Sequence, residues 1–147
     1  MVKKSIRTLS LLLALTLVLA FPARAVEGPQ PRESMFFASY GLDLEKTSPT
    51  CFKVWFDVDS NAVVLDVLGV SEIIIYRSSD RQNWQRMFTF YMADYPAMVD
   101  YNTGSHTGYV TYRSASPGYY YMADVTFYAR DSRGTGMKCL YTPILEM

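Results

Sequence analysis

The chain has 147 residues, of which 50% are hydrophobic, 15% aromatic and 19% charged. That balance excludes a disordered polyelectrolyte and favours a single packed, β-rich domain. The formal net charge is zero, so the sequence lacks the surplus of lysine and arginine on which nucleic-acid binding depends.

Residues 1–25 have the three parts of a cleavable secretion signal. Three basic residues lie within the first seven positions, residues 9–20 are an almost unbroken apolar run, and Ala23-Arg24-Ala25 matches the small-x-small pattern of signal peptidase sites. We expect cleavage after Ala25 and a secreted, extracellular product. An uncleaved membrane anchor is the alternative, but the apolar run is shorter than the roughly 20 residues that a spanning helix needs.

Cleavage changes the charge of the protein. Lys3, Lys4, Arg7 and Arg24 leave with the signal, so ten basic residues face fourteen acidic ones and the net charge becomes −4. A chain of that sign has little affinity for nucleic acids or anionic membrane surfaces. The expected partners are therefore proteins or glycans at the cell exterior, including a second copy of the chain.

Cys51 and Cys139 are the only cysteines. In an oxidising compartment they could form one disulfide that closes a loop of nearly 90 residues. Two free thiols whose Cα atoms lie too far apart to bridge are the alternative. With no CxxC motif and a single histidine, the sequence predicts no metal site and no cofactor.

After a leader at residues 26–34, the sequence predicts one domain over residues 35–147. Runs rich in Val, Ile, Thr, Tyr and Phe alternate there with clusters of turn residues. The expected strands are 35–46, 51–59, 72–78, 84–91, 108–114, 119–130 and 137–145. Residues 61–70 are expected to cross over and plug one end of the core, and residues 92–107 to form a long connection. About seven strands at this spacing are typical of an antiparallel β-sandwich, with a barrel as the alternative.

Period-two alternation predicts which side chains face the core. In the strand 51–59 the inward residues are Phe52, Val54, Phe56 and Val58. In the strand 119–130 they are Tyr119, Tyr121, Ala123, Val125 and Phe127. Trp55 then points outward beside Lys53.

Two segments resemble parts of fibronectin type III modules. Residues 73–84 (IIIYRSSDRQNW) resemble a strand that ends in Arg-Ser, a polar hairpin and a returning tryptophan, and residues 117–121 (PGYYY) resemble the turn and aromatic start of a later strand. Together with residues 36–40, 101–106 and 125–129, they also resemble a family of small, secreted, bacterial single-domain proteins of unknown function. The resemblance implies a fibronectin type III or immunoglobulin-like β-sandwich and an extracellular location. It implies no activity, and the absence of Arg-Gly-Asp argues against integrin-type binding.

Few residues suggest reactive chemistry. His106 is the only histidine, so any Ser-His-Asp or Cys-His arrangement would have to use it, and no Gly-x-Ser-x-Gly elbow is present. We expect His106 to serve packing or turn hydrogen bonding, and the protein not to be an enzyme.

One segment begins like a calcium-binding loop but lacks two residues that such a loop needs. Asp57, Asp59 and Asn61 place oxygen ligands at alternate positions, but Ala62 stands where the loop needs glycine and Leu68 where it needs a bidentate glutamate. The sequence therefore predicts no calcium site, and it predicts solvated turn carboxylates instead.

The strongest functional candidate is a surface. If the strands alternate as assigned, several aromatic and methionine side chains point away from the core on strands expected to be neighbours in one sheet: Ile74, Tyr76, Met87, Tyr91, Tyr120, Met122 and Tyr128. A contiguous patch of this kind usually marks a contact surface. The sequence thus predicts a non-catalytic binding module of unknown ligand. A small carbohydrate-binding domain, with Trp55 or the tyrosines as stacking platforms, is the alternative.

Overall fold

The computed structural model describes residues 33–61 and 64–147. The predicted signal at residues 1–25 and all but the end of the predicted leader lie outside the described residues. The described residues all belong to one compact unit. No helix among the described residues is long and apolar enough to cross a lipid bilayer.

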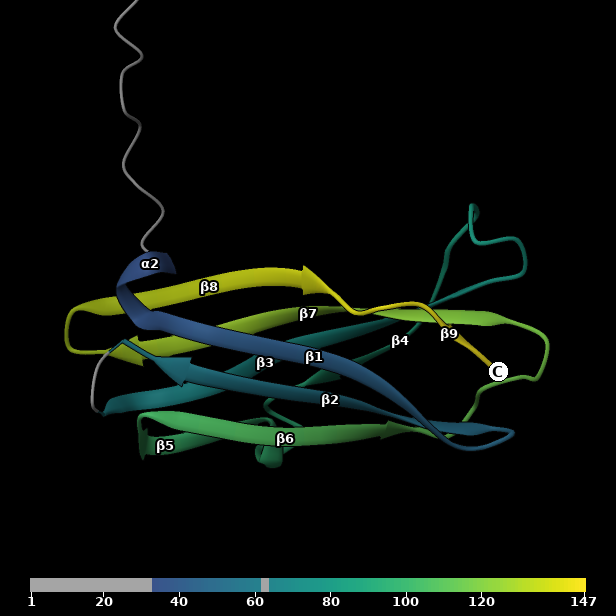
Figure 1. Cartoon of the computed structure of the whole chain (residues 1–147). Coiled ribbons are helices and arrows are strands. Elements are labelled where there is room, and N and C mark those ends of the chain that lie inside the picture. The colour runs from purple at the N-terminus through teal and green to yellow at the C-terminus, as the bar shows by residue number, and fades with distance from the viewer. Residues whose placement is uncertain (1–32, 62–63) are drawn as a thin grey trace, which may run out of the picture. The chain divides into compact units, whose positions relative to one another are not determined.

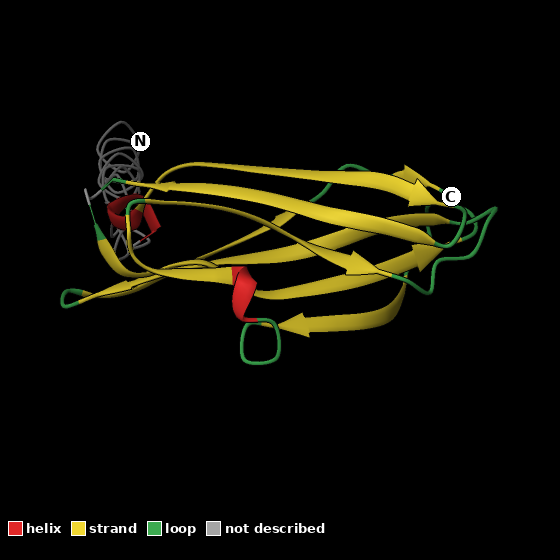
Figure 2. Cartoon of the chain, turned by 90° about the horizontal axis from the view of Figure 1, so that it is seen from below, coloured by secondary structure: helices red, strands yellow, loops and turns green. Residues whose placement is uncertain are grey.

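The domain is an antiparallel β-sandwich, as predicted (Figures 1 and 2). A three-stranded sheet contains, in spatial order, β1 (Phe37–Ser48), β2 (Cys51–Ser60) and β6 (Ser105–Tyr112). A six-stranded sheet has the order β4 (Gln85–Tyr91), β3 (Leu65–Ser78), β7 (Tyr120–Asp131) and β8 (Gly134–Tyr141), with β5 (Val99–Thr103) on β3 and β9 (Leu145–Glu146) on β7. Within the described residues, helical structure is confined to α2 (Glu33–Phe36) and the 3-10 turn η1 (Pro96–Met98).

The predicted alternation is confirmed in the central strand of each sheet. Phe52, Val54, Phe56 and Val58 on β2 are almost fully buried, as are Tyr121, Ala123, Val125 and Phe127 on β7. The rings of Phe52 and Tyr121 lie 5.2 Å apart and join the two sheets. Tyr119, also predicted to point inward, is half-buried and packs against this core just before β7 begins.

The first strand begins two residues later than predicted. Phe36 and Phe37 are consecutive and both buried. Because successive side chains of a strand point to opposite faces, a continuous strand would expose one of the two rings. The chain instead forms α2 through Phe36 and enters β1 at Phe37.

The structure differs from the predicted organisation between residues 61 and 107. Residues 65–70 belong to β3, a strand of 14 residues; of the side chains expected to plug the core, Leu65, Val67 and Leu68 are buried, whereas Val64 is 54% exposed. The expected long connection contains η1, β5 and the start of β6. β5 pairs with the first half of β3, where Gly69 (φ +152°) lets the chains approach, since a Cβ there would lie 2.3 Å from the Met98 carbonyl oxygen.

A buried tyrosine fixes the loop before β7. The Tyr121 hydroxyl oxygen accepts a hydrogen bond of 2.9 Å from the backbone N–H of Ser116, and the Tyr121 side chain is fully buried. In the same turn, Gly118 adopts φ +80° and donates its N–H to the Met147 carbonyl at 2.8 Å. These two bonds tie the turn and the C-terminus to the core.

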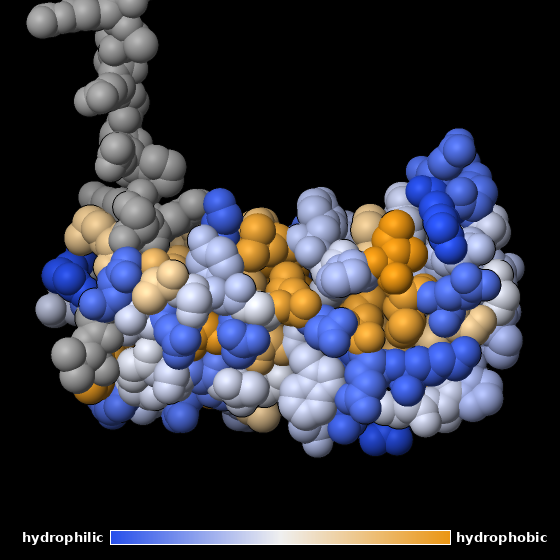
Figure 3. Space-filling model, in the orientation of Figure 1, coloured by the Kyte–Doolittle hydropathy of each residue, from blue (hydrophilic) through white to orange (hydrophobic). Residues whose placement is uncertain are grey.

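The sandwich is open along its long sides, where each sheet ends in an edge strand. On one side, β1 and β8 leave Leu42, Leu140 and Leu145 only partly buried against the core. Figure 3 shows the corresponding apolar surface as patches over β1 and β8 and around β9. On the other side, β4 and β6 border an aromatic pocket.

Candidate binding surfaces

The predicted outward side chains gather on the outer face of the six-stranded sheet. We call this surface the aromatic face and define it by Ile74 and Tyr76 on β3, Tyr91 on β4, Tyr120, Met122 and Tyr128 on β7, and Met137 and Tyr141 on β8. The strand register joins them, because Tyr76 pairs with Met122, and Tyr128 with Met137. Hence six of the residues predicted for this patch share one surface.

Met137 and Tyr141 are the most exposed members of the aromatic face, at 50% and 63%. Sequence reasoning missed them, although the spacing of Met137, Cys139 and Tyr141 is the period of two that places side chains on one face. What the sequence did not reveal is that β8 lies beside β7 with this set facing outward.

Met87 does not belong to the aromatic face, which corrects its predicted outward position. The pairing of β3 with β4 is irregular between Ile75 and Tyr76, which pair with Phe88 and Arg86. This β-bulge at Met87 shifts the alternation by one residue. Met87 is consequently half-buried and packs against the core.

Asp124 lies at the centre of the aromatic face, between Ile74 on β3 and Tyr141 on β8. Its carboxyl accepts a hydrogen bond from the Tyr141 hydroxyl, while its Oδ1 is buried with no hydrogen-bond partner among the described residues. Burial raises the pKa of Asp124 above the usual carboxyl range, and the Asp124 charge in turn raises the pKa of Tyr141. The aromatic face therefore has at its centre a carboxyl whose charge is poorly solvated.

Arg81 covers one end of the aromatic face. Its guanidinium lies 4.1 Å from the centroid of the Tyr120 ring and 3.6 Å from the Glu146 carboxylate. Arg81 belongs to the polar turn between β3 and β4, which projects from the body of the domain (Figure 1). Tyr120 is thus less available to a ligand than Tyr141.

Both cysteines are free thiols, so of the two alternatives that the sequence left open for Cys51 and Cys139, the structure has the unbridged one. Cys51 begins β2 on the outward parity of the three-stranded sheet, and Cys139 points outward from β8 beside Thr126, whose Oγ1 is 3.3 Å from its sulfur. Packed sheets are about 10 Å apart. Because the two cysteines point outward from opposite sheets, the full thickness of the sandwich lies between them. A disulfide requires Cα atoms roughly 4.4–6.8 Å apart, so these two thiols do not form one.

The outer face of the three-stranded sheet carries a second aromatic group. Trp55 pairs with Tyr109, and their ring centroids lie 4.6 Å apart with an interplanar angle of 50°. The Trp55 indole N–H donates to the Glu45 carboxylate at 2.6 Å, and the Lys53 ammonium lies 4.4 Å from the centroid of the Tyr109 ring. We call Trp55 and Tyr109 the aromatic wall.

A hollow of about 520 Å³ lies beside the aromatic wall, and its other lining residues are Ala97, His106, Thr107 and Gly108. His106 is half-buried on β6 rather than in a loop; its Nε2 lies 3.1 Å from the Ala97 carbonyl oxygen, and its ring 5.7 Å from that of Phe56. A carbonyl only accepts, so Nε2 carries the proton. His106 thus anchors η1 to β6.

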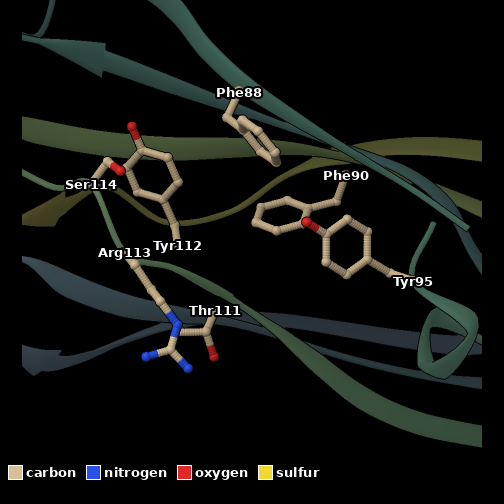
Figure 4. A pocket seen from close by; sticks show the side chains of 7 residues that line it. All are labelled: Phe88, Phe90, Tyr95, Thr111, Tyr112, Arg113 and Ser114. Atoms are coloured by element: carbon tan, nitrogen blue, oxygen red, sulfur yellow. The ribbon is translucent and has the colours of Figure 1, made fainter.

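The pocket between β4 and β6 has a volume of about 260 Å³ (Figure 4). Phe90 makes edge-to-face contacts with Phe88 and Tyr95, with ring centroids 4.9 Å apart in each pair. Figure 4 shows the Arg113 side chain directed away from these rings. Ligand sites usually combine apolar walls with converging polar groups. Thr111, Ser114 and the hydroxyl-bearing Tyr95 and Tyr112 also line the pocket, but its volume is about half that of the hollow beside the aromatic wall, so it is the smaller of the two hollows.

The residues that suggested a calcium loop do not converge. The Asp59 carboxylate accepts a hydrogen bond from the Ser39 hydroxyl at 2.8 Å, and the Asn61 amide donates to the Phe37 carbonyl at 2.9 Å. A Cβ on Gly41 would meet the Asp57 carboxylate, so Asp57 leans toward β1. Within the described ranges, no three His, Cys, Asp or Glu side chains are grouped to hold a metal ion.

Comparison with protein-family models, with curated proteins and with solved structures finds no match. The resemblance to fibronectin type III modules and to the secreted bacterial family therefore stays a prediction. Function has to be inferred from the chemistry of the surfaces themselves.

Proposed function

We propose that the protein is a secreted, non-catalytic binding module that contacts a protein surface through its aromatic face. The observation that carries this proposal is the register of β3, β7 and β8, which joins half-exposed tyrosine and methionine side chains across three neighbouring strands. Tyrosine and methionine are enriched at protein interfaces. Secretion rests on the predicted signal at residues 1–25.

The fold supports a fibronectin type III or immunoglobulin-like assignment within the same proposal. A tyrosine near the start of a strand, bonded through its hydroxyl to backbone a few residues upstream, is a feature of immunoglobulin-type sandwiches. Tyr121 and the backbone N–H of Ser116 have this geometry. Modules of this type often work by presenting a surface.

Among protein partners, a second copy of the chain fits the charges best. The strand register places two arginines and two acidic residues on the outward side of this sheet: Arg86, Arg130, Glu72 and Asp124. Arg86 pairs with Tyr76, and Asp124 pairs with Ile74. Arg130 pairs with Val67 and Thr135, and Glu72 pairs with Thr126. A symmetric dimer brings the same patch of both copies together, so the charges of the patch must be compatible with those of an identical patch. Balanced charges around apolar side chains meet that condition.

The test compares residues 26–147 with two variants of the aromatic face. One variant carries Tyr76→Ser, Tyr120→Ser and Met122→Ser; the other carries Met137→Ser and Tyr141→Ser, the two most exposed positions. Light scattering and sedimentation over a wide concentration range should show a dimer that both variants weaken, with thermal midpoints close to that of the parent. Tyr109→Ser, on the opposite sheet, is the matched control and should dimerise normally.

Two outcomes would contradict the proposal. A parent protein that stays monomeric at every concentration rules out a second copy as the occupant. A dimer that persists in the Met137→Ser/Tyr141→Ser variant, which loses only exposed side chains, shows that the aromatic face is not the contact surface.

A further inference from the structure

We infer that the hollow beside the aromatic wall binds an uncharged glycan, by stacking one sugar ring on Trp55 and Tyr109. This site lies on the three-stranded sheet. It is therefore independent of the aromatic face, which belongs to the opposite sheet.

The aromatic wall is held rigidly from one side. Lys53 lies two residues before Trp55 on β2 and pairs with Glu45 on β1. Glu45 accepts the indole N–H at 2.6 Å, and the Lys53 ammonium lies over both rings, 5.1 Å from the Trp55 centroid and 4.4 Å from that of Tyr109. Fixing the rings before binding lowers the entropy cost of binding.

The other side of the wall is open and has a firm floor. Thr107 lies on this side, and the hollow continues over Gly108 to Ala97. A Cβ on Gly108 would lie 2.8 Å from the Phe56 ring and 3.1 Å from the Ala97 carbonyl oxygen, so the backbone there is closely packed from below. The hydrogen bond between His106 and Ala97 holds η1 as the far rim.

The chemistry of the hollow fits a pyranose ring. Sugars present C–H groups on the faces of the ring and hydroxyls around its edge, so they need an aromatic surface bordered by hydrogen-bonding groups. The wall supplies the surface, and the Thr107 hydroxyl and the His106 ring line the hollow beside it. A volume of about 520 Å³ lies within the range of small-molecule sites.

The charges select against anionic glycans. Three carboxylates surround the wall, on Asp43, Glu45 and Asp57, against the single ammonium of Lys53. That ammonium already lies over the aromatic rings. Sulfated or uronic-acid polymers would meet net negative charge, whereas neutral hexose polymers would find hydrogen-bond acceptors for their hydroxyls.

The test measures binding of residues 26–147 to neutral and anionic polysaccharides. The neutral probes are cellulose, chitin, soluble β-glucan and mannan; the anionic probes are heparin and alginate. We expect saturable binding to at least one neutral probe, weakened about tenfold or more by Trp55→Ala and by Tyr109→Ala, the loss of roughly one aromatic contact. Binding should quench tryptophan emission in a Trp84→Phe background, where Trp55 is the only tryptophan.

Matched variants separate this inference from the proposed function. Tyr109→Phe keeps the ring and should retain most of the affinity, and Met137→Ser/Tyr141→Ser should bind glycan normally while losing the dimer. Binding to none of the neutral probes, a preference for the anionic probes, or full affinity in folded Tyr109→Ala would each overturn the inference. The inference would also be overturned if the parent bound a protein but no glycan, and Trp55→Ala abolished that protein binding.

Discussion

The outer faces of the two sheets rest on one core but differ in size and charge. The aromatic face spreads over four strands, and its charged groups are balanced. The outer face of the three-stranded sheet concentrates its aromatic surface in one pair, Trp55 and Tyr109, and surrounds it with carboxylates. The first geometry suits a broad, flat partner, and the second a ligand of a few rings.

The difference shows that exposure alone does not define a binding surface. Tyr109 and Tyr91 are almost equally exposed, at 45% and 44%. Tyr109 nevertheless lies against an indole, an ammonium and a hollow, whereas Tyr91 faces outward on β4, the edge strand of its sheet, across from Glu72. Neighbouring groups, rather than exposed area, decide which ligand each side chain suits.

The comparison depends first on which side chains of β3 face the core. Ile75 is fully buried, and its neighbour Tyr76 is half-buried on the aromatic face. Ile75→Ala should lower the free energy of unfolding by about 3 kcal/mol, because it leaves a cavity in a packed core. Tyr76→Ala should cost about 1 kcal/mol or less. Urea unfolding of both variants checks this, and equal losses would show that the faces of β3 are misassigned.

A smaller effect is expected at two adjacent tyrosines of β7. Tyr121→Phe removes the acceptor of the Ser116 N–H, and an unpaired, part-buried donor should cost about 1–2 kcal/mol. Tyr120→Phe keeps the ring under Arg81 and should change stability by less than about 0.5 kcal/mol. Thermal unfolding of the pair measures the difference. If Tyr120→Phe is the more damaging variant, the hydroxyl of Tyr121 does not secure the fold.

Sequence periodicity was sufficient to predict the β-sandwich and the faces of its central strands. β2 and β7 alternate without interruption, so burial follows from the period of two. Prediction failed where a local irregularity changes that period. The bulge at Met87 and the consecutive buried rings of Phe36 and Phe37 depend on how a neighbouring strand or sheet packs, which one strand's own sequence does not contain.

The binding surfaces were predictable only in part. Six members of the aromatic face followed from alternation along β3, β4 and β7. Met137 and Tyr141 join them because β8 lies beside β7, which is a fact of topology. Trp55 was predicted to point outward, but its partner Tyr109 was not found, because the sequence does not show that β6 pairs with β2 in the register that joins them.

The central carboxyl of the aromatic face should give a distinctive pH dependence. The pKa of Asp124 is raised in the folded protein, so the folded state binds a proton more tightly than the unfolded chain, and stability falls as pH rises through that pKa. Asp124→Asn should remove this component and raise the free energy of unfolding at neutral pH by no more than about 1 kcal/mol, since solvent screens a partly exposed charge. Unfolding of both proteins between pH 3 and 8 tests the sign.

Asp80 provides an internal contrast to Asp124. Its carboxylate accepts hydrogen bonds from the backbone N–H groups of Asn83 and Gln82, from the Asn83 side chain and from Ser78, and these bonds lower the pKa of Asp80 well below the usual range. Stability from Asp80 is therefore present above the ordinary carboxyl pKa and is lost as pH falls through the depressed value.

The two carboxyls differ in sign, which defines the result that would contradict the prediction for Asp124. If the difference in free energy of unfolding between the parent and Asp124→Asn grew as pH fell, the pKa of Asp124 would not be raised in the folded protein.

The smallest expected change concerns the rigidity of the aromatic wall. Glu45→Gln keeps an acceptor for the Trp55 indole N–H but removes the charge, whereas Glu45→Ala removes the acceptor. Glu45 is exposed, so the free energy of unfolding should change by less than about 0.5 kcal/mol in either variant. Glycan affinity should nevertheless fall more in Glu45→Ala than in Glu45→Gln, because only the alanine variant frees the indole to rotate and adds an entropy cost to binding. Emission from Trp55 in the Trp84→Phe background should become less anisotropic in Glu45→Ala alone. Equal anisotropy in all three proteins would mean that packing against Tyr109, rather than the bond to Glu45, fixes the ring.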